Sequence, residues 1–231
     1  MRQPDPSETF TKLVFLITSL LAPFFLTAFI ALIGQIWLMV NGGPPRIFLQ
    51  PVGKLNLFGH ASTVSLLGFV VPAVVSSLIF VLLLSSRDVL ALRTLAVSAC
   101  AIILIFLAIL ASPSYVAEML DKTRSGAGGG PYNYLASLFE LSLLSLLSYR
   151  LGVTRDTLRL SAVFYVAGFL IGVTSDLLYA KIQSGVMGGF GFFDGDFMFP
   201  LGFALSALCF SRTLQCLEKH DLNISYGRRL H

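Results

Sequence analysis

Charged residues are scarce in this chain of 231 residues: 12% are Asp, Glu, Lys or Arg, whereas soluble domains average about 25%. Hydrophobic residues make up 55% of the chain, and its mean hydropathy is +0.82. The long apolar runs exclude an ordinary soluble domain and indicate an integral membrane protein. The basic residues are scattered and not interleaved with aromatic side chains, so we expect no nucleic-acid partner.

Several catalytic signatures are also missing. The sequence has no HExxH pattern for zinc proteolysis, no Walker A pattern for nucleotide hydrolysis, and no GxSG-type nucleophile with an intramembrane His. Cysteine is limited to Cys100, Cys209 and Cys216, an odd number in or near apolar segments, which we interpret as structural thiols. We therefore expect no cofactor and no metal.

Six apolar segments have the length needed to span a bilayer. They predict an all-α, polytopic membrane protein with about six transmembrane helices in a single membrane domain, residues 1–231. The first segment is too long for a signal peptide and precedes five more, so we expect it to be retained. The segments are about 13–40, 63–85, 90–112, 133–149, 160–181 and 197–217.

The connections between these segments alternate between two membrane faces. Eleven of the sixteen basic residues lie on the face that holds both termini and the turns at 86–89 and 150–159. The positive-inside rule then predicts that both termini are cytoplasmic. The outer connections, 41–62, 113–132 and 182–196, are rich in Gly and Pro, which predicts irregular loops.

Four acidic residues lie at or near membrane depth: Glu140, Asp176, Asp194 and Asp196. An ionisable group inside a span costs at least about 2.5–3.5 kcal/mol on insertion scales, so each is a functional candidate. Glu140 has an alternative interpretation as a helix–helix hydrogen-bonding residue, with local partners among the serines of its own segment. Those serines are Ser137, Ser142, Ser145 and Ser148.

Asp176 shares a helix face with two glycines, because Gly168, Gly172 and Asp176 are spaced i, i+4, i+8. Such a pair of glycines lets another helix approach closely, so Asp176 should point at that partner helix. The alternative is that its carboxylate only accepts a hydrogen bond from a neighbouring hydroxyl as part of the packing.

The segment "GVMGGFGFFDGDFMFP", residues 185–200, brings two acids to the last span. Asp194 with Gly195 is a favoured turn dipeptide, Asp196 is a good helix N-cap, and Pro200 suits a first helical turn. The preceding residues are apolar and flexible instead of polar, which predicts a re-entrant segment. Non-helical backbone at that depth needs protein or a water-filled cavity beside it.

"IGVTSDLLYA" followed by "GGFGFFDGDFMFPLG" resembles the catalytic pair of GxGD aspartyl intramembrane proteases, the presenilins and signal peptide peptidases. Together with "GFVVP" at 68–72, these motifs look closer to an uncharacterised prokaryotic polytopic family described as presenilin-like. The resemblance covers about 165–205 well and 64–76 loosely. It implies a prokaryotic plasma-membrane protein in which Asp176 pairs with Asp194 or Asp196.

The sequence departs from the protease pattern in four places. The protease register falls on Phe193-Asp194-Gly195-Asp196, and Ser175 stands where the family has a tyrosine. Nine spans are expected and six are present, and the C-terminal Pro-Ala-Leu motif is missing. The resemblance to the uncharacterised family implies Asp194, and the protease register implies Asp196.

The resemblance implies a water held between two Asp carboxylates that share a proton, with an extended membrane peptide as substrate. The flanking glycines would leave room for the substrate backbone to approach. These are Gly188, Gly189, Gly191 and Gly195.

Two other functions are open on the sequence alone. The same carboxylates could bind or relay a cation or proton. Alternatively, the chain is a non-catalytic subunit or scaffold whose outer loops contact a membrane partner. In every case the lipid bilayer is a partner.

Overall fold

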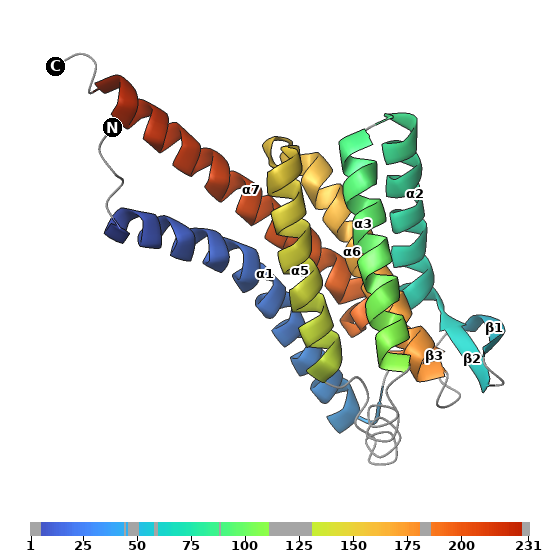
Figure 1. Cartoon of the computed structure of the whole chain (residues 1–231). Helices are drawn as coiled ribbons and strands as arrows, with labels where there is room; N and C mark the ends of the chain where they lie inside the picture. Colours follow the sequence, from blue (N-terminus) through green and yellow to red (C-terminus); the bar gives the residue numbers. More distant parts are fainter. Residues whose placement is uncertain are drawn as a thin grey trace.

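The computed structural model describes residues 6–43, 45, 51–57, 60–87, 89–110, 131–180 and 186–227. These residues form six α-helices, and the predicted all-α fold is confirmed (Figure 1). Most of the predicted outer loop 113–132 lies outside the described residues. The helices are α1 Pro6–Val40, α2 Val71–Ser85, α3 Val89–Leu110, α5 Pro131–Leu151, α6 Thr157–Ala180 and α7 Gly195–Gly227.

Each of the six helices overlaps one of the six apolar segments. Of the segments described, four are long and apolar enough to cross a membrane, while α3 contributes a shorter apolar stretch, Val89–Ile105. The four long segments make the chain compatible with an integral membrane protein. They are Thr9–Val40, Leu66–Ser85, Thr157–Thr174 and Gly195–Lys219.

Three buried phenylalanines join α1, α6 and α7 at the centre of the bundle. Phe24, Phe164 and Phe203 are fully buried, and the ring of Phe203 lies 5.7 Å from that of Phe24 and 6.4 Å from that of Phe164. α7 thus packs against both α1 and α6, and α3 packs against α5 and α6. This packing fixes the beginning of α7 relative to the end of α6, where the acids lie.

A small sheet lies at one end of the bundle, beyond the helices (Figure 1). β1 Pro51–Leu57 pairs antiparallel with β2 His60–Ser65, and β2 pairs in parallel with β3 Val186–Met187. The register places Thr63 opposite Val186. The sequence predicts irregular loops here because of their Gly and Pro content, and β-pairing between segments far apart in the chain was not predicted.

The second helix begins later than the sequence predicts. The strand β2 continues to Ser65, a π-helical turn η1 follows at Leu66–Val70, and α2 begins at Val71. The Ser65 hydroxyl accepts the Gly68 N–H at 3.3 Å. Pro72 suits the first turn of α2 because it has no N–H to leave unpaired. Apolarity alone therefore placed the start at 63, a few residues too early.

Candidate functional site: three converging carboxylates

Two glycines bring α6 and α7 into close contact beside the acids. A Cβ added at Gly172 would lie 2.9 Å from Cα of Asp196 and closer still to its Oδ1. A Cβ added at Gly168 would lie 2.9 Å from the carbonyl oxygen of Phe199. The first turn of α7 therefore occupies the groove that the missing side chains of α6 leave open.

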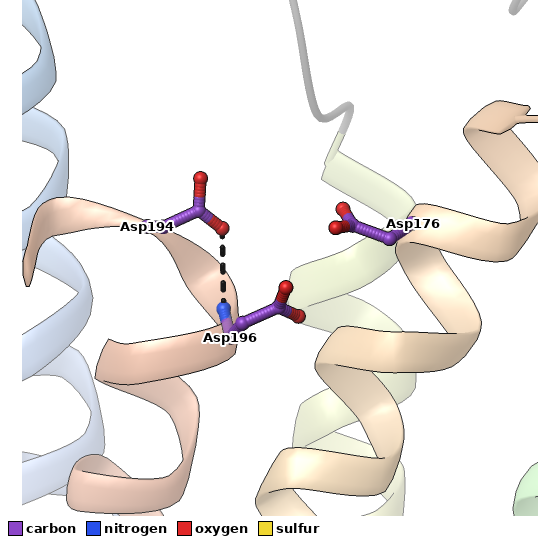
Figure 2. Close-up of side chains that lie close together, drawn as sticks. All are labelled: Asp176, Asp194 and Asp196. Carbon is purple, nitrogen blue, oxygen red and sulfur yellow. Dashed lines mark hydrogen bonds between the residues drawn. The ribbon is translucent and has the colours of Figure 1, made fainter. Parts of the chain in front are cut away.

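Asp176, Asp194 and Asp196 converge in space. One carboxylate oxygen from each residue lies within 4.8 Å of the corresponding oxygens of the other two. Figure 2 shows Asp176 on α6 pointing across the gap toward the first turn of α7, with Asp196 reaching back toward it. Asp196 is 1% exposed, whereas Asp176 and Asp194 are half-buried. The described residues therefore cover the Asp196 side of the cluster more completely than the side of Asp176 and Asp194.

Asp194, and not Asp196, caps α7. Its Oδ1 accepts the N–H of Asp196 at 3.3 Å (Figure 2), and its Oδ2 accepts the N–H of Phe190 at 3.1 Å. The sequence predicts Asp196 as the N-cap, and this is wrong because the helix begins at Gly195, two residues earlier than expected. Burial raises the pKa of the Asp194 carboxyl above its ordinary value, and the backbone amides that it accepts oppose this rise.

Asp196 has no hydrogen-bond partner outside the three acids. Both of its carboxylate oxygens are buried and unpaired, and Oδ2 of Asp176 is in the same condition. Within the part of the chain that the structure describes, no basic side chain forms an ion pair with any of the three acids. Unpaired buried carboxylates are costly, so this arrangement is retained only with a proton or another positive charge between them.

The glycine-rich segment that precedes the acids packs against protein. Gly188 has φ +71°, and its backbone lies against that of Gly68 in η1, where a Cβ would have no room. The backbone amide of Gly188 also donates to the Asp176 carboxylate. Gly191, with φ +59°, is buried, and Gly189 and Gly195 are half-buried. The open backbone of Gly188 is therefore occupied by Gly68 instead of being left free for a substrate.

Residues of α1 that the sequence did not single out hold the same segment in place. Nε2 of Gln35 donates to the Phe193 carbonyl oxygen at 2.7 Å, and the Phe193 ring fills the space beside Gly34. Phe193 directly precedes Asp194, so this contact fixes the peptide that carries one of the acids. An amide within an otherwise apolar segment is the signal that could have identified Gln35.

Glu140 lies apart from the other acids. It is fully buried in α5, where the Ser98 hydroxyl of α3 donates to its Oε1, and its Oε2 is unpaired. The hydrogen bond to Ser98 fits the helix–helix interpretation of Glu140, but its donor lies on α3 and is not one of the serines of its own segment. Ser142 and Ser145 instead donate to carbonyls of their own helix, at 2.8 and 2.7 Å.

Comparisons of the chain with protein-family models, with curated proteins and with solved structures find no match. The resemblance to GxGD proteases therefore remains a prediction from the motifs around Asp176, Asp194 and Asp196. What the arrangement can do chemically follows from its geometry: three carboxylates can hold a proton and a water between them, or they can bind a cation.

Proposed function

We propose that the protein is a membrane-embedded aspartyl peptidase that hydrolyses a membrane peptide. The observation that supports it is the convergence of Asp176 and Asp196 from two consecutive helices, with unpaired carboxylate oxygens facing one another. Asp196 suits the reacting pair better than Asp194 because the oxygens of Asp194 already accept backbone amides. Both acids of a pair must keep oxygens free for water and substrate.

The reaction needs one ionised and one protonated carboxyl group, a state that two carboxylates at short range favour. The ionised carboxylate takes a proton from a water while that water's oxygen bonds to the peptide carbonyl carbon. The protonated carboxyl group donates a hydrogen bond to the carbonyl oxygen as negative charge develops there. Collapse of the tetrahedral intermediate breaks the C–N bond, and the proton taken from water passes to the amine leaving group.

The substrate proposed is a membrane peptide that unwinds locally near the acids. Asp176 lies within the last two turns of α6, so the scissile bond would lie toward that end of the bundle. The excess of basic residues on the other face supports cytoplasmic termini, which makes this the outer end of a prokaryotic plasma membrane. Helix-breaking residues at the outer end of a span would then mark a substrate.

Two assays on purified, reconstituted protein test this proposal. The first follows cleavage of single-span peptides with helix-breaking residues near one end, by mass spectrometry. The second measures binding of a peptide with a hydroxyethylene group in place of the scissile amide, which mimics the tetrahedral intermediate. We expect Asp176→Asn and Asp196→Asn to reduce the cleavage rate about 10²–10⁴-fold, because each removes one partner of the acid–base pair.

The control is Asp156→Asn, because Asp156 is an exposed acid whose carboxylate pairs with Arg159 at 2.9 Å, away from the cluster. This variant should cleave at the rate of the unmodified protein. Circular dichroism must show that all the variants remain folded. Unchanged cleavage by Asp176→Asn or by Asp196→Asn would contradict the proposed pair.

A further inference from the structure

The proposed hydrolysis does not require the third acid, Asp194, so its presence needs another explanation. A pair of carboxylates is sufficient to activate water, yet Asp194 places a third carboxylate oxygen within 4.8 Å of the other two. Its cap on α7 explains why a residue with a side-chain acceptor stands there. Ser, Thr or Asn would also cap the helix, however, and would add no charge. The charge of Asp194 is the feature that capping leaves unexplained.

A cluster of acids is not by itself a binding site, and the independent observation is the state of Asp196. Its side chain is 1% exposed, and neither carboxylate oxygen has a hydrogen-bond partner outside the three acids. Figure 2 shows this carboxylate directed into the space between Asp194 and Asp176, where a buried oxygen of Asp176 is also unpaired. Unpaired acceptor oxygens from two helices are therefore aimed at one point.

We infer that Asp176, Asp194 and Asp196 form a binding site for a calcium-sized divalent cation, which takes one oxygen from each carboxylate. Carboxylate oxygens are the ligands that such hard cations prefer. Asp176 and Asp194 are half-buried, so the described residues do not enclose the cluster completely. The inference does not rest on the proposed hydrolysis.

The separation of the oxygens favours calcium over magnesium. Calcium binds oxygen at about 2.3–2.6 Å, so two of its ligands can lie up to about 5.2 Å apart, whereas the octahedral shell of magnesium allows only about 4.2 Å. Three oxygens at the full 4.8 Å from one another would lie about 2.8 Å from a common centre, so a small inward movement brings them into the calcium range, whereas magnesium needs a larger one. Magnesium could bind only if any two carboxylate oxygens that lie more than about 4.2 Å apart moved closer together.

Thermal unfolding of the purified full chain tests the inference. It is monitored by circular dichroism in the presence of calcium, of magnesium, or of potassium at matched ionic strength. At a calcium concentration about 100-fold above the dissociation constant, we expect the Tm to rise by about 5–10 °C. Magnesium should produce a smaller rise at the same concentration. Isothermal titration calorimetry should give one calcium ion per chain.

Two variants separate binding at the three acids from general effects of the salt. Asp194→Asn keeps a cap acceptor for α7, and Asp196→Asn loses no hydrogen bond to a group outside the three acids. Both should lose most of the calcium-induced rise, while Asp156→Asn should keep it. Without calcium, Asp196→Asn should unfold at the same or a higher Tm than the unmodified protein, because charge repulsion is reduced.

A calcium-induced rise that is as large in Asp194→Asn and Asp196→Asn as in the unmodified protein would overturn the inference, and so would no rise in the unmodified protein. A lower Tm of Asp196→Asn without calcium would indicate a structural role of its charge and would also count against it. Calcium stabilisation without any peptide cleavage would leave the inference standing and the peptidase proposal unsupported. The two proposals therefore fail separately.

Discussion

The two places where this chain buries carboxylates differ in what surrounds the acid. Glu140 lies between α3 and α5, where the Ser98 hydroxyl donates to one of its oxygens. Asp196 is equally buried, but its nearest polar side chains are two further acids, and neither of its oxygens is paired. A buried acid with a hydroxyl donor joins two helices, whereas acids gathered without a donor need a proton or cation from outside the fold.

The largest effect on the acid cluster is expected from Gly172→Val, which displaces the acids through packing and changes none of them. A Cβ at Gly172 has no room beside Asp196, so α6 and α7 must separate at the acids. We expect loss of the calcium-induced rise in Tm and at least about a 100-fold fall in cleavage, since misplacement by about 1 Å can cost that much. Overpacking should also cost about 1–3 kcal/mol of stability.

Gly53→Ala is the control for Gly172→Val, because a Cβ at Gly53 meets no atom within 4 Å. It should leave the Tm and the calcium-induced rise as they are in the unmodified protein. A Gly172→Val protein with full cleavage and calcium binding would show that the contact between α6 and α7 does not position the acids.

The second prediction concerns the site of Glu140, where removal of the donor should affect stability and not function. Ser98→Ala leaves a fully buried carboxylate without its hydroxyl, which should cost about 1–3 kcal/mol, measured by thermal or chemical unfolding. Cleavage and the calcium-induced rise should stay within twofold of the unmodified protein. Loss of calcium binding in this variant would erase the distinction between the two buried acid sites.

Ser145→Ala is the matched control, because Ser145 is also buried but donates to the Leu141 carbonyl of its own helix. That carbonyl belongs to the helix interior and has its own backbone donor, so removal of this hydroxyl should cost less than removal of that of Ser98. Equal losses of stability would indicate that the effect of Ser98→Ala is one of packing volume.

The smallest effect is expected from Gln35→Met, which removes the donor to the Phe193 carbonyl but keeps a side chain of similar length. Loss of one hydrogen bond of this kind costs about 1 kcal/mol, so we expect calcium affinity to fall about fivefold, measured by calorimetry. Asn41→Ala removes an exposed amide that bonds the Trp37 carbonyl on the same helix, and it should leave the affinity unchanged. An unchanged affinity in Gln35→Met would show that α1 does not position the acids.

The helices could be predicted from the sequence, because apolar runs of spanning length satisfy their backbone hydrogen bonds locally. Contacts between distant segments could not. The pairing of β2 with β3 joins residues near 63 to residues near 186, and no local pattern of Gly, Pro or apolar residues encodes that register. The predicted loop at 41–62 also contains β1 and the start of β2, which its Gly and Pro content did not indicate.

By itself the sequence determined that the chain forms apolar helices, that four acids lie in or beside apolar segments, and that glycines on α6 permit a close neighbour. Only the tertiary structure decided which helix end fills that groove, and that Asp194 caps α7 while Asp196 faces Asp176. The start of α7 at Gly195 sets the direction of each acid, because successive helical residues point about 100° apart. A start two residues later would make Asp196 the cap in place of Asp194, and the packing against α1 and α6 fixes the observed position.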